Sequence, residues 1–243
     1  MQVIGHRGAA ALAPENTWAA FDVALDLGVD AVETDIHATS DGVLVLIHDA
    51  TLDRTTNGHG AVCRTPWAEI LELDAGYWFD ERFRGQRVPA LAETLARYGS
   101  GTHWVLEIKQ EGVQHAVLDL VRERDLLVST TFISFHFNVV RELRLLEPNA
   151  KLGWLVGIYN SHTVTKAVEA GLNQLCPPAD LLSDTLFADC EAAGIEVRTW
   201  AVRNEETMRR VMSLPVAGMT IDSPDLLLRA LGRRDRDYDE NAS

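Results

Sequence analysis

Residues 31–37 read Ala-Val-Glu-Thr-Asp-Ile-His, a short segment that carries two carboxylates, Glu33 and Asp35. On a β-strand, residues two apart point to the same face. Acidic side chains are rarely buried in an apolar core without partners. A pair that faces inward is best accommodated at the open carboxyl end of a barrel of parallel strands, so the segment predicts one strand of a β/α barrel.

Strand-like and helix-like segments alternate along the rest of the chain. Each strand segment is short and rich in β-branched or aromatic residues. The expected strands are Val3–Gly5, Ala31–His37, Trp104–Lys109, Thr130–Phe135, Leu152–Val156, Asn173–Cys176, Glu196–Val202 and Gly218–Asp222. The expected helices are one that starts at Asn16 as N-cap and ends before Gly28, then Leu91–Tyr98, Val113–Arg124, Val139–Leu146, Thr163–Ala170, Ser183–Ala193, Glu205–Met212 and Pro224–Leu231. Eight alternations predict an α/β fold, a (β/α)8 TIM barrel, as one catalytic domain over residues 1–231.

The connection between the second and third barrel strands is longer than a single crossover helix needs. It holds a short expected strand, Val43–Ile47, and the turn signal Asn57-Gly58. The connection therefore predicts a small insertion after strand two, at about residues 50–90, on the end of the barrel where active sites lie. Residues 232–243 are rich in charge and are expected to form a disordered tail.

Ionisable side chains are expected to cluster at neighbouring strand ends. They are His6 and Arg7 after the first strand, Glu33 and Asp35 on the second, His48 and Asp49 after the short strand, and Glu107 and Lys109 on the third barrel strand. A lone Glu-x-Asp or His-Arg pair is more often part of a solvated turn. Their combination at one barrel rim favours an active site.

Three of these side chains, Glu33, Asp35 and Glu107, are carboxylates. Two like charges about 4 Å apart repel by about 4 kcal/mol at an effective dielectric near 20, so three ionised acids need a cation between them. Ligands that are all oxygen favour a hard divalent ion, Mg²⁺ or Ca²⁺. Zinc fits less well without a histidine ligand, although His37 keeps that alternative open.

The composition is that of a soluble protein with an acid excess. Among 243 residues, 22 are basic and 36 acidic, which gives a net charge of −14 and argues against a nucleic-acid or anionic-membrane partner. No apolar run suits a membrane anchor, and no leader is expected before the first strand. Cys63, Cys176 and Cys190 have no paired spacing, so we expect free thiols and a cytoplasmic location.

Linked motifs fill the first half of the chain and recur at its end. They are His6-Arg7-Gly8, Pro14-Glu15-Asn16-Thr17, Glu33-Thr34-Asp35, Thr39-Ser40-Asp41-Gly42, His48-Asp49, Leu52-Asp53-Arg54-Thr55-Thr56, Pro89-Ala90-Leu91, Glu107-Ile108-Lys109 and Asp222-Ser223-Pro224. Together they resemble the motifs of the glycerophosphodiester phosphodiesterase family (GDPD). One departure is Ile221, which stands where many relatives have threonine, and it leaves one rim contact in doubt.

The resemblance implies a TIM barrel with a small insertion after strand two, and metal-dependent hydrolysis of glycerophosphodiesters to glycerol 3-phosphate and an alcohol. The chemistry of the residues agrees with it. His6 and His48 are the expected acid–base pair. Arg7 and Lys109 are the expected phosphate ligands, and Trp200 is an expected substrate contact. Attack by the neighbouring 2-hydroxyl of glycerol would give a cyclic phosphate that water opens, with the histidines exchanging roles between the steps.

Other residues and functions are weaker candidates. His37 and His136 are candidates for substrate contact, with loop decoration and rim packing as alternatives, and Asn16 is better explained as a helix cap. A lysophospholipase D or another phosphodiester lyase would hold a lipid tail, and a catalytically silent barrel would lack an essential residue. The expected partner is a small-molecule glycerophosphodiester. The sequence leaves open its headgroup, the native metal and whether the chain forms a homo-oligomer.

Overall fold

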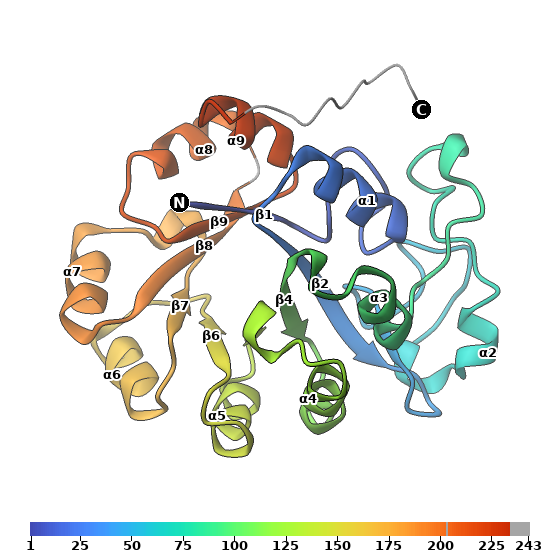
Figure 1. The fold of residues 1–243 in the computed structure, drawn as a ribbon, viewed down its shortest axis with the longest axis horizontal. Coiled ribbons are helices and arrows are strands. Elements are labelled where there is room, and N and C mark those ends of the chain that lie inside the picture. The colour runs from blue at the N-terminus through green and yellow to red at the C-terminus, as the bar shows by residue number, and fades with distance from the viewer. Residues whose placement is uncertain (203, 234–243) are drawn as a thin grey trace.

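Eight parallel strands close into a barrel in the computed structural model, which describes residues 1–202 and 204–233 (Figure 1). The barrel strands are β1 (Gln2–Gly5), β2 (Ala31–Ala38), β4 (His103–Ile108), β5 (Thr130–Ser134), β6 (Lys151–Leu155), β7 (Gln174–Cys176), β8 (Glu196–Val202) and β9 (Gly218–Ile221). β1 pairs with both β2 and β9, which closes the ring. The predicted (β/α)8 TIM barrel is confirmed, and each barrel strand lies within one residue of its predicted bounds.

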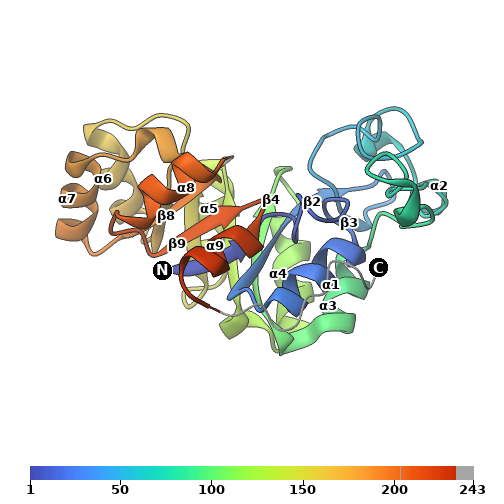
Figure 2. The same ribbon diagram turned by 90° about the horizontal axis from the view of Figure 1, so that it is seen from above.

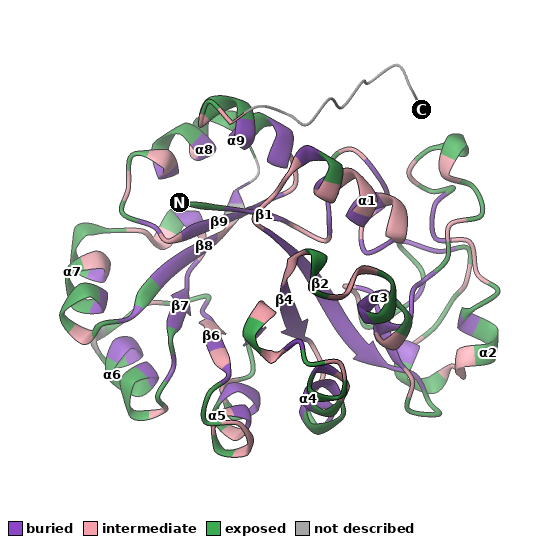
Figure 3. Ribbon diagram, in the orientation of Figure 1, coloured by how far each residue is buried: buried purple, intermediate pink, exposed green. Residues whose placement is uncertain are grey.

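Helices surround the ring of strands and bury the face that they turn toward it (Figure 3). They are α1 (Trp18–Leu27), α3 (Leu91–Tyr98), α4 (Gln114–Glu123), α5 (Phe137–Leu146), α6 (Ser161–Glu169), α7 (Asp184–Ala193), α8 (Glu205–Met212) and α9 (Pro224–Ala230). Their apolar residues recur at helical spacing, so one stripe of each helix packs on the strands. In this layer Phe21 of α1 meets Trp104 of β4 edge to face, with ring centroids 5.8 Å apart.

The first helix begins one residue later than predicted. Its N-cap is Thr17, whose hydroxyl accepts a hydrogen bond from the Ala20 N–H, and Gly28 ends it in the left-handed conformation with φ 80°. The prediction that Asn16 caps the helix is wrong. Asn16 adopts φ 57° and uses its amide to bind Asp35 of β2 instead.

The stretch between β2 and α3 forms an insertion with a small core of its own. β3 (Leu44–Leu46) pairs antiparallel with the end of β2, and α2 (Trp67–Ile70) follows. Figures 1 and 2 show α2 and its flanking loops beside β2 and β3, on the side of the barrel away from α6 and α7. The core is aliphatic and consists of Val45, Ile47, Leu52, Val62, Ile70, Ala75 and Val88.

The described chain ends against the barrel. Arg233 donates hydrogen bonds to both carboxylate oxygens of Asp30, at 2.6 and 2.7 Å, so the first residues of the predicted tail are held in place. The rest of that predicted tail, residues 234–243, lies outside the described residues. Within the two described ranges, no helix has both the length and the apolar character needed to cross a membrane.

Apolar side chains fill the barrel interior beneath the acids, toward the amino ends of the strands. This cluster consists of Ile4, Ala31, Val105, Ile133, Leu155 and Cys176. Because side chains alternate along a strand, Glu33 and Asp35 follow Ala31 on the inward face of β2, one layer after another toward its carboxyl end. The barrel interior is therefore filled by apolar side chains toward the amino ends of the strands, and its polar residues lie toward the carboxyl ends.

Candidate active site

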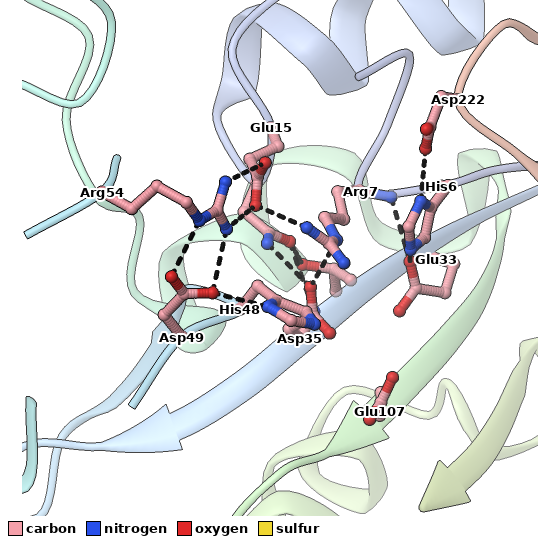
Figure 4. Close-up of polar contacts among 12 residues, drawn as sticks. His6, Arg7, Glu15, Glu33, Asp35, His48, Asp49, Arg54, Glu107 and Asp222 are labelled. Atoms are coloured by element: carbon pink, nitrogen blue, oxygen red, sulfur yellow. Dashed lines mark hydrogen bonds and ion pairs between the residues drawn. The ribbon is translucent and has the colours of Figure 1, made fainter. Parts of the chain in front are cut away.

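Three acids face one another at the carboxyl end of the barrel (Figure 4). Glu33 and Asp35 come from β2, and Glu107 lies opposite Asp35 on the paired strand β4. One carboxylate oxygen from each lies within 4.8 Å of the others, and all three residues are buried. In residues 1–202 and 204–233 this is the group of acidic, histidine and cysteine ligands able to hold a metal ion, and no histidine belongs to it.

Two cations lie against these acids. Lys109 Nζ is 2.8 Å from Glu107 Oε1 and 3.4 Å from Asp35 Oδ1. Arg7 Nε is 3.2 Å from Asp35 Oδ2, and the Arg7 backbone N–H donates to Glu33 Oε2 at 3.0 Å. Asp35 is therefore the acid with cations on two sides, and it is fully buried.

The environment separates the pKa values of the three acids. Burial disfavours the Asp35 carboxylate, but the charges of Arg7 and Lys109 outweigh burial and hold the pKa of Asp35 well below its usual range. Burial and the neighbouring Asp35 charge raise the pKa of Glu33. The same two causes raise the pKa of Glu107 to about 7. In the metal-free protein, repulsion among the acids is thus concentrated on Glu33 and Glu107.

Within this group of acids, two buried carboxylate oxygens receive no hydrogen bond from the described residues. They are Glu33 Oε1 and Asp35 Oδ1. A buried acceptor without a donor is costly, so native sites normally satisfy it with a proton donor or a cation. An all-oxygen set of three carboxylates with unsatisfied oxygens matches the ligand preference of a hard divalent cation. The residues present therefore fit a metal ion.

A tight turn after β1 delivers the first histidine and arginine. Arg7 and Gly8 both adopt left-handed backbone conformations, with φ 52° and 87°. A Cβ atom on Gly8 would lie 2.5 Å from the backbone carbonyl of Ala20 in α1. Only glycine fits there, because the turn packs directly on the helix backbone. This packing explains why a glycine follows His6-Arg7 in the sequence.

His6 is oriented by Asp222, the residue that follows β9. The His6 Nδ1–H donates to Asp222 Oδ1, which leaves Nε2 facing the acids at 3.9 Å from Glu33 Oε2 (Figure 4). Burial opposes protonation of His6, but the bond to Asp222 and the Glu33 charge outweigh burial, so the pKa of His6 is raised. Asp222 was recognised in the sequence only as part of a motif and not as a partner of His6.

His48 is oriented in the same way by its neighbour in the sequence. It follows β3, and its Nδ1–H donates to Asp49 Oδ1 at 2.7 Å. Burial lowers the pKa of His48. Both histidines thus hold Nδ1 against a carboxylate, which fixes the orientation of each ring.

A chain of ion pairs connects the barrel turn with the insertion (Figure 4). Glu15 accepts from Arg7 Nη1 at 2.7 Å and from both terminal nitrogens of Arg54 at 2.8 Å. Arg54 in turn donates from Nε to Asp49 Oδ2 at 2.8 Å and from Nη2 to Asp49 Oδ1 at 3.0 Å. The carboxylate that orients His48 is therefore itself fixed by Arg54.

Asn16, in the turn before α1, forms hydrogen bonds with Asp35 and the neighbouring Thr34 of β2. Its Nδ2–H donates to Asp35 Oδ2 at 2.9 Å, and its Oδ1 accepts from the Thr34 hydroxyl at 2.7 Å. Sequence reasoning missed this role, and it also missed Glu15, Arg54 and Asp222 as partners. The signal that could have found them was their place within the quoted motifs, which hold more polar residues than turns require.

The cavity above the packed barrel interior measures about 510 Å³. It contains His6, Arg7, Glu33, His48, Glu107 and Lys109, with Asp35 buried beside them. Trp200 also lines it and donates its indole N–H to the Cys176 carbonyl at 2.9 Å. His37 and His136 are not among the lining residues. The ring Nε2 of His37 contacts the His48 carbonyl at 3.2 Å, and that of His136 contacts the Lys109 carbonyl at 3.1 Å. All eight predicted site residues are thus brought together.

The chain matches the model of the glycerophosphoryl diester phosphodiesterase family over residues 6–226. It is 35% identical over 234 residues to the glycerophosphodiester phosphodiesterase of Caldanaerobacter subterraneus, covering 93% of this chain and 96% of that protein. A crystal structure of glycerophosphodiester phosphodiesterase from Agrobacterium tumefaciens superimposes with a TM-score of 0.85 at 31% identity, over 94% of this chain and 99% of that one. An Oleispira antarctica phosphodiesterase in complex with the product sn-glycerol-3-phosphate gives a TM-score of 0.88 at 28% identity, over 96% and 97% of the two chains. The chain therefore belongs to the glycerophosphoryl diester phosphodiesterase family.

Proposed function

We propose that this protein hydrolyses glycerophosphodiesters to glycerol 3-phosphate and an alcohol, by acid–base catalysis between His6 and His48 at a divalent metal site. The observation that carries the proposal is the convergence of two carboxylate-oriented histidines, three acids and two cations on one cavity. A phosphodiester needs its charge neutralised, a nucleophile deprotonated and a leaving alkoxide protonated, and the cavity holds groups for each task.

The metal site belongs to Glu33, Asp35 and Glu107, and Mg²⁺ or Ca²⁺ suits their oxygen ligands. When bound, such an ion supplies Lewis-acid stabilisation of a phosphoryl oxygen. Arg7 contributes a planar guanidinium and Lys109 a point charge at the same rim, and both can neutralise the remaining phosphate charge. Because the whole chain is acidic and both cations are paired with acids, binding of an anionic substrate depends on these cations together with the metal ion.

The histidines move the protons. In the first step the 2-hydroxyl oxygen of glycerol bonds to phosphorus and gives its proton to one histidine, while the bond from phosphorus to the alcohol oxygen breaks and the other histidine protonates that oxygen. In the second step water opens the cyclic phosphate, and the two histidines return to their starting protonation states. Asp222 and Asp49 hold the rings so that Nε2 faces the reacting groups in both steps.

The substrate is a small molecule, and a reducing compartment such as the cytoplasm suits the chain. Its three cysteines are free thiols, two of them buried. No disulfide supports the fold in the described residues, which is the usual situation for a protein kept reduced.

The test is release of glycerol 3-phosphate from glycerophosphocholine, measured with a coupled glycerol 3-phosphate dehydrogenase assay. The purified protein is assayed after treatment with EDTA and again after addition of excess Mg²⁺ or Ca²⁺. We expect turnover that EDTA abolishes and one of the two ions restores. Absence of metal-dependent release from every glycerophosphodiester offered would overturn the proposal.

A further inference from the structure

Arg198 is a cation inside the barrel that the reaction does not account for. It lies on β8 between Glu196 and Trp200 on the inward face, and it lines the same cavity as the acids. Its relative exposure is only 2%, so its guanidinium is almost completely removed from water. A guanidinium group is a cation in proteins, so Arg198 brings a full positive charge into the barrel interior.

Arg198 has no acidic partner among the described residues. Its Nη1 donates to the Thr220 hydroxyl at 2.7 Å and its Nη2 lies 3.4 Å from Cys176 Sγ, both neutral groups. Its Nε–H, fully buried, has no hydrogen-bond partner. The other two cations of the cavity differ, because Arg7 pairs with Glu15 and Asp35, and Lys109 pairs with Glu107 and Asp35.

A buried charge without a counter-charge is costly, and a site that keeps one usually meets an opposite charge when it is occupied. Apolar walls from Ile133, Leu155 and Val202 line the cavity with Arg198 and strengthen any interaction with an anion, because they exclude water. The unsatisfied Nε–H and the planar guanidinium fit a carboxylate or phosphate group, whose oxygens can accept hydrogen bonds in pairs.

A glycerophosphodiester consists of a phosphate, a glycerol and an alcohol headgroup, and each can be considered as the source of that anion. The bridging phosphate belongs to the acids, Arg7 and Lys109 on the proposed function, and the glycerol is neutral. The remaining part is the alcohol. We infer that Arg198 is a specificity-determining residue that binds a carboxylate or second phosphate on the alcohol headgroup, so that this enzyme favours glycerophosphodiesters with an anionic headgroup. The inference rests on the proposed function.

One neighbouring feature favours the opposite charge. Phe135 and Trp200 pack edge to face with ring centroids 5.2 Å apart, and both line the cavity. Aromatic rings attract a cationic headgroup such as choline. The full charge of Arg198 in the same low-dielectric cavity repels that cation, and a full charge acts more strongly than a ring quadrupole. Choline esters are therefore the right competitors for the test.

The test compares two glycerophosphodiesters that differ only in headgroup charge. Their headgroups are N-acetylserine, which carries a carboxylate, and N-acetylserinamide, which does not, and glycerophosphocholine is the cationic comparison. Coupled release of glycerol 3-phosphate gives kcat/KM for each. For the wild type we expect the carboxylate substrate to exceed the amide by about 10- to 100-fold, the value of a charged hydrogen bond. Arg198→Met should remove that advantage, so that the carboxylate and amide substrates give kcat/KM values within about threefold of each other.

Arg209→Met serves as the matched control, because Arg209 is exposed on α8 and its ion pair among the described residues is with Glu205 of the same helix. Arg198→Lys keeps the charge and should retain part of the preference. If circular dichroism shows that Arg198→Met does not fold, the test rests on the kcat/KM values of the wild type. The inference is then overturned if the wild type hydrolyses the choline or the amide substrate as fast as the carboxylate substrate, or faster. An equal loss on all three substrates in folded Arg198→Met also overturns it, because Arg198 would then bind a part that they share. If the wild type hydrolyses none of them, the proposed function itself fails.

Discussion

Two conservative substitutions in the metal site should change the stability of the metal-free protein in opposite directions. Asp35→Asn removes the acid that two cations stabilise, Arg7 at 3.2 Å and Lys109 at 3.4 Å. Glu107→Gln removes an acid whose ionisation the fold opposes, because burial and the Asp35 charge raise its pKa to about 7. Both variants lose one proposed metal ligand, so both should lose metal-dependent activity by about 100-fold or more.

The magnitudes follow from the partners that remain. Removing one member of a buried ion pair costs about 3–5 kcal/mol, and we take the lower end for Asp35→Asn because Arg7 keeps Glu15 and Lys109 keeps Glu107. For Glu107, a rise of the pKa from 4.5 to about 7 means that ionisation costs the folded state about 3 kcal/mol. A raised carboxyl pKa gives stability that is complete below about pH 4.5 and lost as the pH rises through 7.

The assay is thermal unfolding in EDTA at pH 5 and pH 8. For a chain of this size 1 kcal/mol corresponds to about 2–4 °C, so Asp35→Asn should unfold about 6–12 °C below the wild type at pH 8. Glu107→Gln should unfold up to about 6–12 °C above it at pH 8, with a much smaller difference at pH 5. An unfolding temperature of Asp35→Asn equal to that of the wild type would contradict these assignments. So would a Glu107→Gln variant that unfolds below the wild type at pH 8.

Three further predictions concern the groups around the acids. His6→Ala and His48→Ala should each lose about 100-fold or more in kcat while their circular dichroism spectra stay unchanged, and wild-type turnover in either would remove that histidine from the reaction. Arg54→Met should lower kcat by about tenfold with a smaller effect on KM, because Arg54 fixes Asp49 and Asp49 in turn orients His48. An unchanged kcat would show that this chain of ion pairs does not position the His48 ring. Gly8→Ala should destabilise the protein by about 2–4 kcal/mol in urea unfolding, because its Cβ would lie 2.5 Å from the Ala20 backbone, and a loss below about 0.5 kcal/mol would contradict the tight packing of that turn.

The barrel could be predicted from the sequence, because the residues of each strand and helix show a local pattern. Alternating β-branched and helical segments, closed by glycines such as Gly28 and Gly194, predict the elements within one or two residues. The same alternation predicts which strand residues face inward, so Glu33, Asp35, Glu107 and Lys109 could be assigned to one rim before their distances were known.

The partners of those residues could not be predicted in the same way. Asp222 reaches His6 across the closure of the barrel between β1 and β9, and Arg54 reaches Glu15 from the insertion. Such contacts depend on where the chain returns in space, which no local pattern encodes. Asn16 shows the same limit, because a residue before a helix reads as a cap, whereas a left-handed backbone turns its amide toward Asp35.

The central claim, metal-dependent hydrolysis of a glycerophosphodiester at this site, can be tested most directly by ³¹P NMR. The EDTA-stripped wild-type protein is mixed with glycerophosphocholine, and spectra are recorded before and after addition of Mg²⁺ or Ca²⁺. The account predicts that the diester signal is stable in EDTA and converts to glycerol 3-phosphate after one of the ions is added. A diester signal that persists with every metal, or that decays equally fast in EDTA, would contradict it.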